Sequence, residues 1–250
     1  MPKNDAVTFS LSDIGEALAL LTRLPVHSEF TRGARAAWAW PIAGLVVACL
    51  AGIVGWAGIK LGLPAPAVAA LVIGAQMMMT GALHEDGLAD TFDGLWGGFD
   101  RHERLEIMKD SHIGSYGVLA LILALILRWS ALTALVGAGS FAPFLAAVAM
   151  SRAPMAVLMS VLPNARGSGL SNNFGHPPRD TAWLAVGAAM LIGLFAIGWS
   201  VVVLAFWVSL PVAALATIAR TKIGGQTGDI LGASQQIAEI TALLTLAAWL

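Results

Sequence analysis

The sequence is poor in charge and in cysteine. Charged residues make up 12% of its 250 residues, whereas soluble proteins have about 25%. So few charged side chains cannot cover a water-facing surface, which excludes a soluble globular domain, and the apolar composition excludes disorder. The 14 basic and 15 acidic residues give a net charge of −1, so the basic surplus of a nucleic-acid-binding protein is missing. A single cysteine, Cys49, excludes a disulfide framework and a thiolate metal site.

Long apolar runs dominate instead. Apolar residues make up 58% of the chain, and the mean hydropathy is +0.78. A membrane-spanning helix takes about 20 such residues, and runs of this length predict about seven spans: 36–59, 61–83, 117–136, 141–162, two within 181–219, and 230–250. Before them, 11–24 reads as an amphipathic helix at the interface or a half-span, with Asp13 and Glu16 off its apolar face. The sequence predicts an all-α polytopic membrane helix bundle, one integral-membrane domain over 1–250.

The basic residues predict the orientation. Alternate segments between the spans carry eleven Lys and Arg residues on one side of the membrane and one on the other. By the positive-inside rule, the N-terminus and the segments 84–116, 163–180 and 220–229 are expected in the cytoplasm. Two arginines fall inside spans. Arg128 is expected near a helix end, with its guanidinium reaching the interface, and Arg152 is expected to be functional because a charge inside a span is costly.

Acidic residues concentrate in one predicted cytoplasmic segment. Eight of the 15 fall within 85–110. Asp86, Asp90 and Asp93 recur at i, i+4 and i+7, so they share one face of a helix. Three carboxylates on one face repel one another unless a cation lies among them, and oxygen ligands favour Mg²⁺ or Mn²⁺. The pattern therefore favours a metal site over the alternative, a solvated acidic helix face.

The surroundings of these carboxylates suit an anionic substrate. Gly87 and Gly94 are expected to leave the acidic face open to a bulky anion. Arg104 and Lys109 could contact phosphate, although the same helix also fits a surface helix with Glu–Lys and Glu–Arg pairs. The following loop, 111–117 (SHIGSYG), is expected to bind an anion through its backbone.

A Gly-rich segment, 220–232, opens the last span. Its free N–H groups, together with Arg220 and Lys222, are expected to bind phosphate at the helix start. Asp229 either completes the metal site or caps the helix. His84, which begins the acidic segment, is either a base or phosphate donor, or a hydrogen-bonded structural residue.

Five motifs occur in a fixed order between residues 22 and 233: TRLPV, HEDGLADTFDG, RLEIMKDSHIGSYG, the Ser151–Arg152 pair and GGQTGDILGA. In these motifs the chain resembles the cobalamin synthase family, also called adenosylcobinamide-GDP ribazoletransferase. The resemblance implies a multi-pass, Mg²⁺-dependent enzyme in the cytoplasmic (inner) membrane of a bacterium. It joins adenosylcobinamide-GDP to α-ribazole, or its 5′-phosphate, and releases GMP in the final assembly of adenosylcobalamin.

Residue chemistry and resemblance together predict the roles of individual side chains. The predicted metal ligands are Asp86, Asp90 and Asp93. Glu85 is predicted either as a fourth ligand or as a residue that contacts the ligands without contacting the metal. The predicted bases are Asp110 and His84. The predicted substrate-binding residues are Arg104, Lys109, Arg152, Lys222, Gln226 and Asp229.

Other functions remain open at this point. Similar acidic signatures occur in membrane CDP-alcohol phosphotransferases, so another diphosphate-using membrane enzyme is the first alternative. An ion-coupled transporter is disfavoured. Such a protein would place its carboxylates near the middle of the bilayer, whereas the acidic cluster of this chain lies outside the predicted spans 36–83 and 181–219. The expected partners are the two substrates and the lipid bilayer, and a homo-oligomer is left open.

Overall fold

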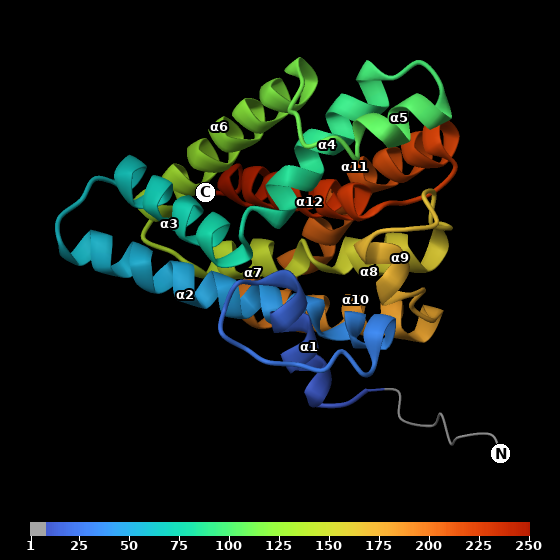
Figure 1. Ribbon diagram of the computed structural model, residues 1–250. Helices are drawn as coiled ribbons and strands as arrows, with labels where there is room; N and C mark the ends of the chain where they lie inside the picture. The colour runs from blue at the N-terminus through green and yellow to red at the C-terminus, as the bar shows by residue number, and fades with distance from the viewer. Residues whose placement is uncertain (1–8) are drawn as a thin grey trace.

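The computed structural model describes residues 9–250, and this part of the chain is built from helices (Figure 1). Among these residues, one isolated bridge between Asn164 and Gln226 is the only β-pairing. The prediction of an all-α bundle is confirmed. The elements are α1 (Ser12–Leu21), the 3₁₀-helix η1 (Gly33–Ala39), α2 (Trp40–Lys60), α3 (Ala65–Thr80), α4 (Leu83–Gly97), α5 (Arg101–Ile107), α6 (Ser115–Gly137), α7 (Ala142–Met150), α8 (Ala153–Val161), α9 (Leu170–Phe174), α10 (Arg179–Ile197), α11 (Ser200–Ile223) and α12 (Gly228–Ala247).

The membrane spans match the predicted number of about seven. Within residues 9–250, six stretches are long and apolar enough to cross a bilayer: Gly33–Lys60, Ser115–Gly137, Ala142–Val161, Arg179–Ile197, Ser200–Ile223 and Gly228–Ala247. The pair α3–α4 would be a seventh, but it is bent by 88°. The bend lies at Gly81 and Ala82, which both have positive φ (64° and 56°). The predicted span 61–83 therefore ends early, and α4 runs across the bundle.

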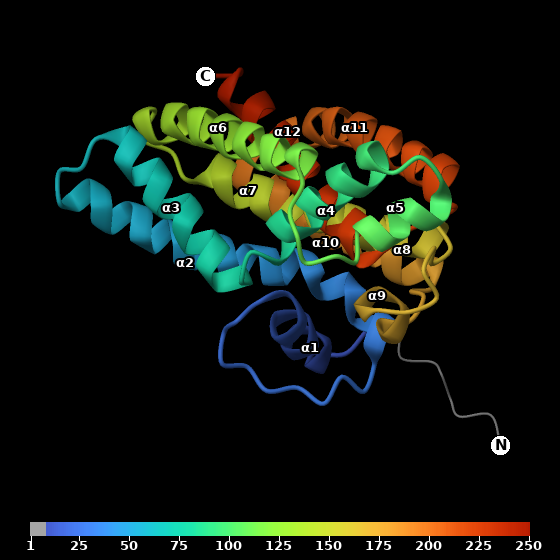
Figure 2. The same cartoon turned by 45° about the horizontal axis from the view of Figure 1, so that its top comes forward.

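Helix α12 lies at the centre of the bundle. It packs against α4, α6, α7, α8 and α11, and Figures 1 and 2 both show α4 crossing it near the middle of the molecule. Helices α2 and α10 pack on α7, while α1 lies beside η1 at one end. Many core residues are small, and Ala147, Ala156 and Ala233 are fully buried. Small side chains let helix axes approach closely, which is how helices associate in lipid.

Glycines allow α4 to cross α12 in direct backbone contact. A Cβ atom at Gly87 would lie 2.9 Å from the carbonyl oxygen of Asp229 and 3.1 Å from the Cα of Gly232. A Cβ atom at Gly94 would lie 2.8 Å from the carbonyl oxygen of Arg104 in α5. The expectation that Gly94 leaves a face open to substrate is wrong, because α5 and Met108 occupy that space, whereas Gly87 packs on α12 and also lines a cavity.

Helix α1 forms as predicted, but its acidic residues point inward. Asp13 and Glu16 are buried, with exposed fractions of 0% and 1%. The Asp13 carboxylate accepts a hydrogen bond from Nε1 of Trp38 (2.6 Å), and Glu16 accepts from the backbone N–H groups of Arg32 (2.9 Å) and Gly33 (3.1 Å). Glu16 thereby satisfies the first N–H groups of η1, which have no partner within that helix.

The helix crossing generates a test. We expect Gly87→Ala to destabilise the protein by about 1–3 kcal/mol, because the added methyl meets backbone that cannot move aside easily. Thermal unfolding in detergent would measure the change. Gly74→Ala in α3 is the matched control, since nothing lies within 4 Å of its added Cβ. Equal stability of the two variants would contradict the tight crossing.

Candidate functional site

Helix α4 distributes its acidic side chains to three different environments. Glu85 lies 6% exposed in the bundle interior, whereas Asp86 is exposed. Asp90 is half-buried, and Asp93 is buried against the start of α6. Since successive residues on a helix point about 100° apart, one helix can contribute to a buried network and to an open site at once.

Arg128 is the centre of the buried network. It lies within α6 and is 1% exposed, so the expectation that it reaches the interface is wrong. Its Nη1 donates to Glu85 (2.8 Å) and Gln236 (3.1 Å), and its Nη2 donates to Glu239 (3.0 Å) and Gln76 (3.4 Å). An arginine among apolar helices is very costly unless carboxylates compensate it. The two glutamates allow Arg128 to stay charged there.

Arg152 extends the network from the break between α7 and α8. Its Nη1 donates to Glu239 (2.9 Å), to the carbonyl oxygen of Val148 (2.7 Å) and to the hydroxyl of Ser151 (2.9 Å). Nε2 of Gln235 donates to Glu239 (2.6 Å) and to Ser151 (2.9 Å). The hydrogen bonds of Arg152, the arginine that was expected to be functional, thus all come from Nη1 and all end on buried partners.

The four charges of this network balance. Arg128 and Arg152 supply two positive charges, and Glu85 and Glu239 supply two negative charges. The network joins α3, α4, α6 and α12 to the α7–α8 break. A role for Glu85 toward a metal, or for Arg152 toward a diphosphate, stays a prediction, and either role would have to compete with these ion pairs. Glu239 was not among the predicted residues. Its position inside the last predicted span was the available signal, because an acid within a span is costly unless it is paired.

Asp93 receives the backbone contacts that were predicted for a substrate anion. The N–H groups of Gly114 and Gly117 donate to its carboxylate at 2.7 and 2.9 Å. The loop 111–117 therefore does bind an anion, but that anion is the Asp93 side chain. The carboxylate satisfies free N–H groups at the start of α6, where a negative charge is favoured. Metal binding by Asp93 stays a prediction.

Two of the predicted phosphate ligands contact main-chain carbonyls. Arg104 donates to the carbonyl oxygens of Lys222 (3.2 Å) and Phe99 (2.8 Å). The ammonium of Lys222 donates to the carbonyl oxygen of Leu95 (2.6 Å) and lies 4.8 Å from the centre of the Trp96 ring. Both side chains thereby connect α4 and α5 to the end of α11, where cations also stabilise the helix C-terminus. Their contact with a diphosphate stays a prediction.

The Gly-rich segment pairs with the loop after α8. The backbone N–H of Gln226 donates to Pro163 (2.8 Å), and its carbonyl accepts from Ala165 (2.8 Å). Gln226 is 2% exposed, and its Oε1 has no hydrogen-bond partner among the described residues. Thr227 begins α12 as its N-cap, with Oγ1 accepting from Ile230 N (3.4 Å).

Asp229 is therefore not the cap of α12. It lies in the first turn and accepts from Nη2 of Arg166 (2.9 Å) and from the hydroxyl of Thr227 (3.1 Å). Arg166 comes from the loop after α8, and sequence analysis did not select it. Its position next to a glycine, in a polar segment predicted to be cytoplasmic, was the available signal. Of the two roles left open for Asp229, capping is excluded and a place in a charged site remains.

Asp86, Asp90 and Asp229 meet where α4 crosses α12. No hydrogen bond or ion pair from a described residue reaches the side chains of Asp86 and Asp90. The negative charges of Asp229 and Asp86 repel a negative charge on Asp90, and Asp86 and Asp229 also repel each other. Within residues 9–250, no three acidic, His or Cys side chains already stand at metal-binding spacing. Mg²⁺ usually takes only one or two carboxylates, with water and substrate phosphate supplying the rest. Asp86 and Asp90 are the carboxylates available to it, because Asp229 is already paired with Arg166.

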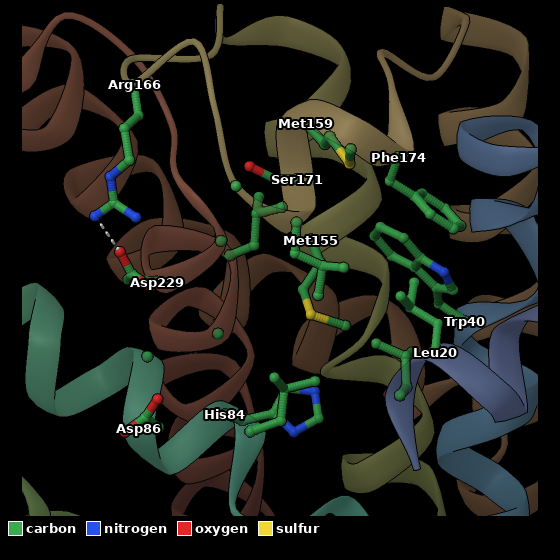
Figure 3. Close-up of a pocket in the computed structure, with 18 of the residues that line it drawn as sticks. Leu20, Trp40, His84, Asp86, Met155, Met159, Arg166, Ser171, Phe174 and Asp229 are labelled. Carbon is green, nitrogen blue, oxygen red and sulfur yellow. Dashed lines mark hydrogen bonds and ion pairs between the residues drawn. The ribbon is translucent and has the colours of Figure 1, made fainter. Parts of the chain in front are cut away.

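Two cavities meet at Asp86. The first extends from Asp86 and Asp229 to Trp40 and Phe174 (Figure 3). The second lies on the other side of Asp86, between α4 and the loop before α6, where Lys109 lines it. A carboxylate shared by two cavities suits an enzyme that joins two substrates.

The two predicted bases lie in different cavities. His84 lines the first cavity, is 2% exposed, and its Nε2 has no hydrogen-bond partner among the described residues. Asp110 lines the second and is bonded to Nδ1 of His112 (2.7 Å). That hydrogen bond lowers the pKa of Asp110 and raises the pKa of His112. A lowered pKa makes Asp110 a weaker base than an ordinary aspartate.

Comparison with known proteins gives one consistent result. A family described as "Cobalamin-5-phosphate synthase" matches residues 13–247. The chain is 42% identical to the adenosylcobinamide-GDP ribazoletransferase of Bradyrhizobium diazoefficiens, covering 100% of this chain and 98% of the relative. Those of Mesorhizobium japonicum and Brucella ovis are 41% and 38% identical, each covering 94% of this chain and 92% and 96% of the relatives. No solved structure matches the chain significantly.

The buried network can be tested by removing one charge. Glu239→Gln leaves Arg152 without a carboxylate and Arg128 with one, so we expect a loss of about 3–5 kcal/mol of stability. Thermal unfolding in detergent would measure it. Glu106→Gln, on the exposed side of α5, is the control and should change stability by less than about 0.5 kcal/mol. A stable Glu239→Gln variant would show that the arginines are compensated in another way.

Proposed function

Since the chain belongs to the cobalamin-5-phosphate synthase family, we propose that it transfers the cobinamide phosphoryl group of adenosylcobinamide-GDP to α-ribazole or its 5′-phosphate. The observation that carries this proposal is the position of Asp86, which lines two cavities, with Asp229 in the first and Asp90 in the second. Each cavity can take one substrate, and Asp86 lies between them.

The reaction is a displacement at phosphorus. The 3′-hydroxyl oxygen of α-ribazole forms a bond to the phosphorus on the cobinamide side. The bond from that phosphorus to the bridging oxygen breaks, and GMP leaves with the electron pair. The hydroxyl proton passes to a base, for which His84 and Asp110 stay the two candidates. Phosphoryl transfer depends mainly on positioning and charge compensation, which the α4–α12 crossing supports by fixing the carboxylates on two rigid helices.

Asp86 and Asp90, which have no ion-pair partner among the described residues, would hold a magnesium ion at this crossing, with water and substrate phosphate as its other ligands. When bound, the ion neutralises charge on the diphosphate. Two of the predicted ligands are left out: Glu85 is paired with Arg128, and Asp93 accepts hydrogen bonds from the backbone N–H groups of Gly114 and Gly117. Arg166, which is already paired with Asp229 (2.9 Å) and lines the first cavity, would contact a substrate phosphate there.

The proposed site faces the cytoplasm. Segments 84–116, 163–180 and 220–229 contribute the acidic residues and Arg166, and all three belong to the Lys- and Arg-rich side of the chain. In a bacterium this is the inner face of the cytoplasmic membrane, where nucleotide substrates are available.

Release of GMP from adenosylcobinamide-GDP tests the reaction. Purified protein in nanodiscs should release GMP only when α-ribazole (or its 5′-phosphate) and Mg²⁺ are both present. Asp86→Asn and Asp90→Asn should each lower kcat about 100-fold or more and raise the Mg²⁺ concentration needed for half-maximal rate, because a neutral amide is a weak ligand for a hard cation. Asp180→Asn, at an exposed aspartate of α10, is the control. Near-normal turnover in both variants would remove the carboxylates from the mechanism.

Cysteine labelling tests the orientation. In a Cys49→Ser background, cysteines replacing the exposed Ser111 and Ser168 should react with an impermeant maleimide only after the cytoplasmic face is opened. A cysteine replacing Leu61, which is 81% exposed between α2 and α3, should react from outside in intact cells. The reverse labelling pattern would invert the proposed topology.

A further inference from the structure

We infer that the first cavity binds the acceptor, with the benzimidazole ring of α-ribazole at its aromatic end and the ribose toward Asp86 and Asp229. This inference rests on the proposed function, which requires an acceptor but does not say where it binds. The cavity is the one drawn in Figure 3, between α2, α4, α8, α9 and α12.

The aromatic end has the composition of a site for a flat apolar ring. Trp40 and Phe174 lie with ring centres 6.1 Å apart and planes tilted by 35°, and Met155, Met159 and Leu20 complete this end. Aromatic rings and methionines are favourable neighbours for an aromatic ligand.

The other end carries the charges that the reaction needs. Asp86, Asp229 and Arg166 line it, and Figure 3 shows them on the side of the cavity away from Trp40 and Phe174. A nucleoside that places its base on the aromatic side therefore directs its sugar toward the proposed metal and phosphate contacts. This direction is required for attack by the 3′-hydroxyl.

His84 supplies an independent sign that a polar ligand atom belongs in this cavity. Its Nε2 is buried and has no partner among the described residues, and its imidazole borders the open space in Figure 3. Buried polar atoms are nearly always hydrogen-bonded. Both the unsubstituted ring nitrogen and the ribose hydroxyls of α-ribazole can form this bond, since a neutral imidazole nitrogen can donate or accept.

The donor fits this cavity less well. Guanine presents several donors and acceptors along its edge, and each would lose its hydrogen bonds to water among Trp40, Phe174, Met155 and Met159. The base of α-ribazole, dimethylbenzimidazole, has one free ring nitrogen and two methyl groups, so its burial costs little. The corrin ring with its amide side chains is larger and more polar than this end of the cavity.

Steady-state kinetics and direct binding test the assignment. Trp40→Ala should raise the KM for α-ribazole about tenfold or more and leave the KM for adenosylcobinamide-GDP within about twofold. Met159→Trp, which fills the cavity instead of enlarging it, should do the same. Equilibrium dialysis of α-ribazole alone against each variant should show the same loss of affinity. Trp183→Ala, at a 73% exposed tryptophan of α10, is the matched control and should change neither constant.

The outcomes separate this inference from the proposed function. If wild-type protein binds α-ribazole and releases GMP, but Trp40→Ala and Met159→Trp raise only the KM for the donor, then the cavity belongs to the donor and the inference is wrong. Unchanged constants in a folded Met159→Trp variant would also overturn it, even if Trp40→Ala does not fold. If wild-type protein releases no GMP with either acceptor, the proposed function fails, whereas α-ribazole binding that depends on Trp40 would still support the site.

Discussion

The ion pairs of Arg128 with Glu85 and Glu239 are the interaction on which the site depends. A guanidinium among apolar helices cannot lose its carboxylates without a large cost, so α4, α6 and α12 are fixed relative to one another by charge as well as by packing. Glu85 precedes Asp86 in the chain. The buried pair therefore determines which way the next residue points, and it directs Asp86 to the boundary of the two cavities.

The close contact of α4 with α12 also fixes the position of the carboxylates, because the packing of the two backbones allows one arrangement. Gly87 and Gly232 allow the backbones to touch, and this brings Asp229 of one helix beside the acidic face of the other. The same carboxylates could not meet across side chains of ordinary size. Repulsion among them is the cost of this arrangement, and a bound cation together with Arg166 would offset that cost.

Much of the fold could be predicted because lipid imposes simple rules. Spans need about 20 apolar residues, and the predicted runs correspond to the helices within one turn or two at most ends. The run 61–83 contains α3, whose 16 residues are too few to span the membrane alone, and positive φ at Gly81 and Ala82 turns the chain by 88° into α4. Hydropathy predicted the end of this run within one turn, but it does not show the direction of the helix that follows.

The sequence by itself determined the helical membrane class, the family, and the concentration of carboxylates in one segment, since hydropathy, motif order and charge are local properties of the chain. The tertiary structure decided how those carboxylates are divided. Asp93 binds the start of α6, Glu85 is neutralised by Arg128, and Asp86 and Asp90 stay open beside Asp229. Partners far apart in the sequence make this division. Helical spacing defines only which residues share a face, while the neighbouring helices determine what that face contacts.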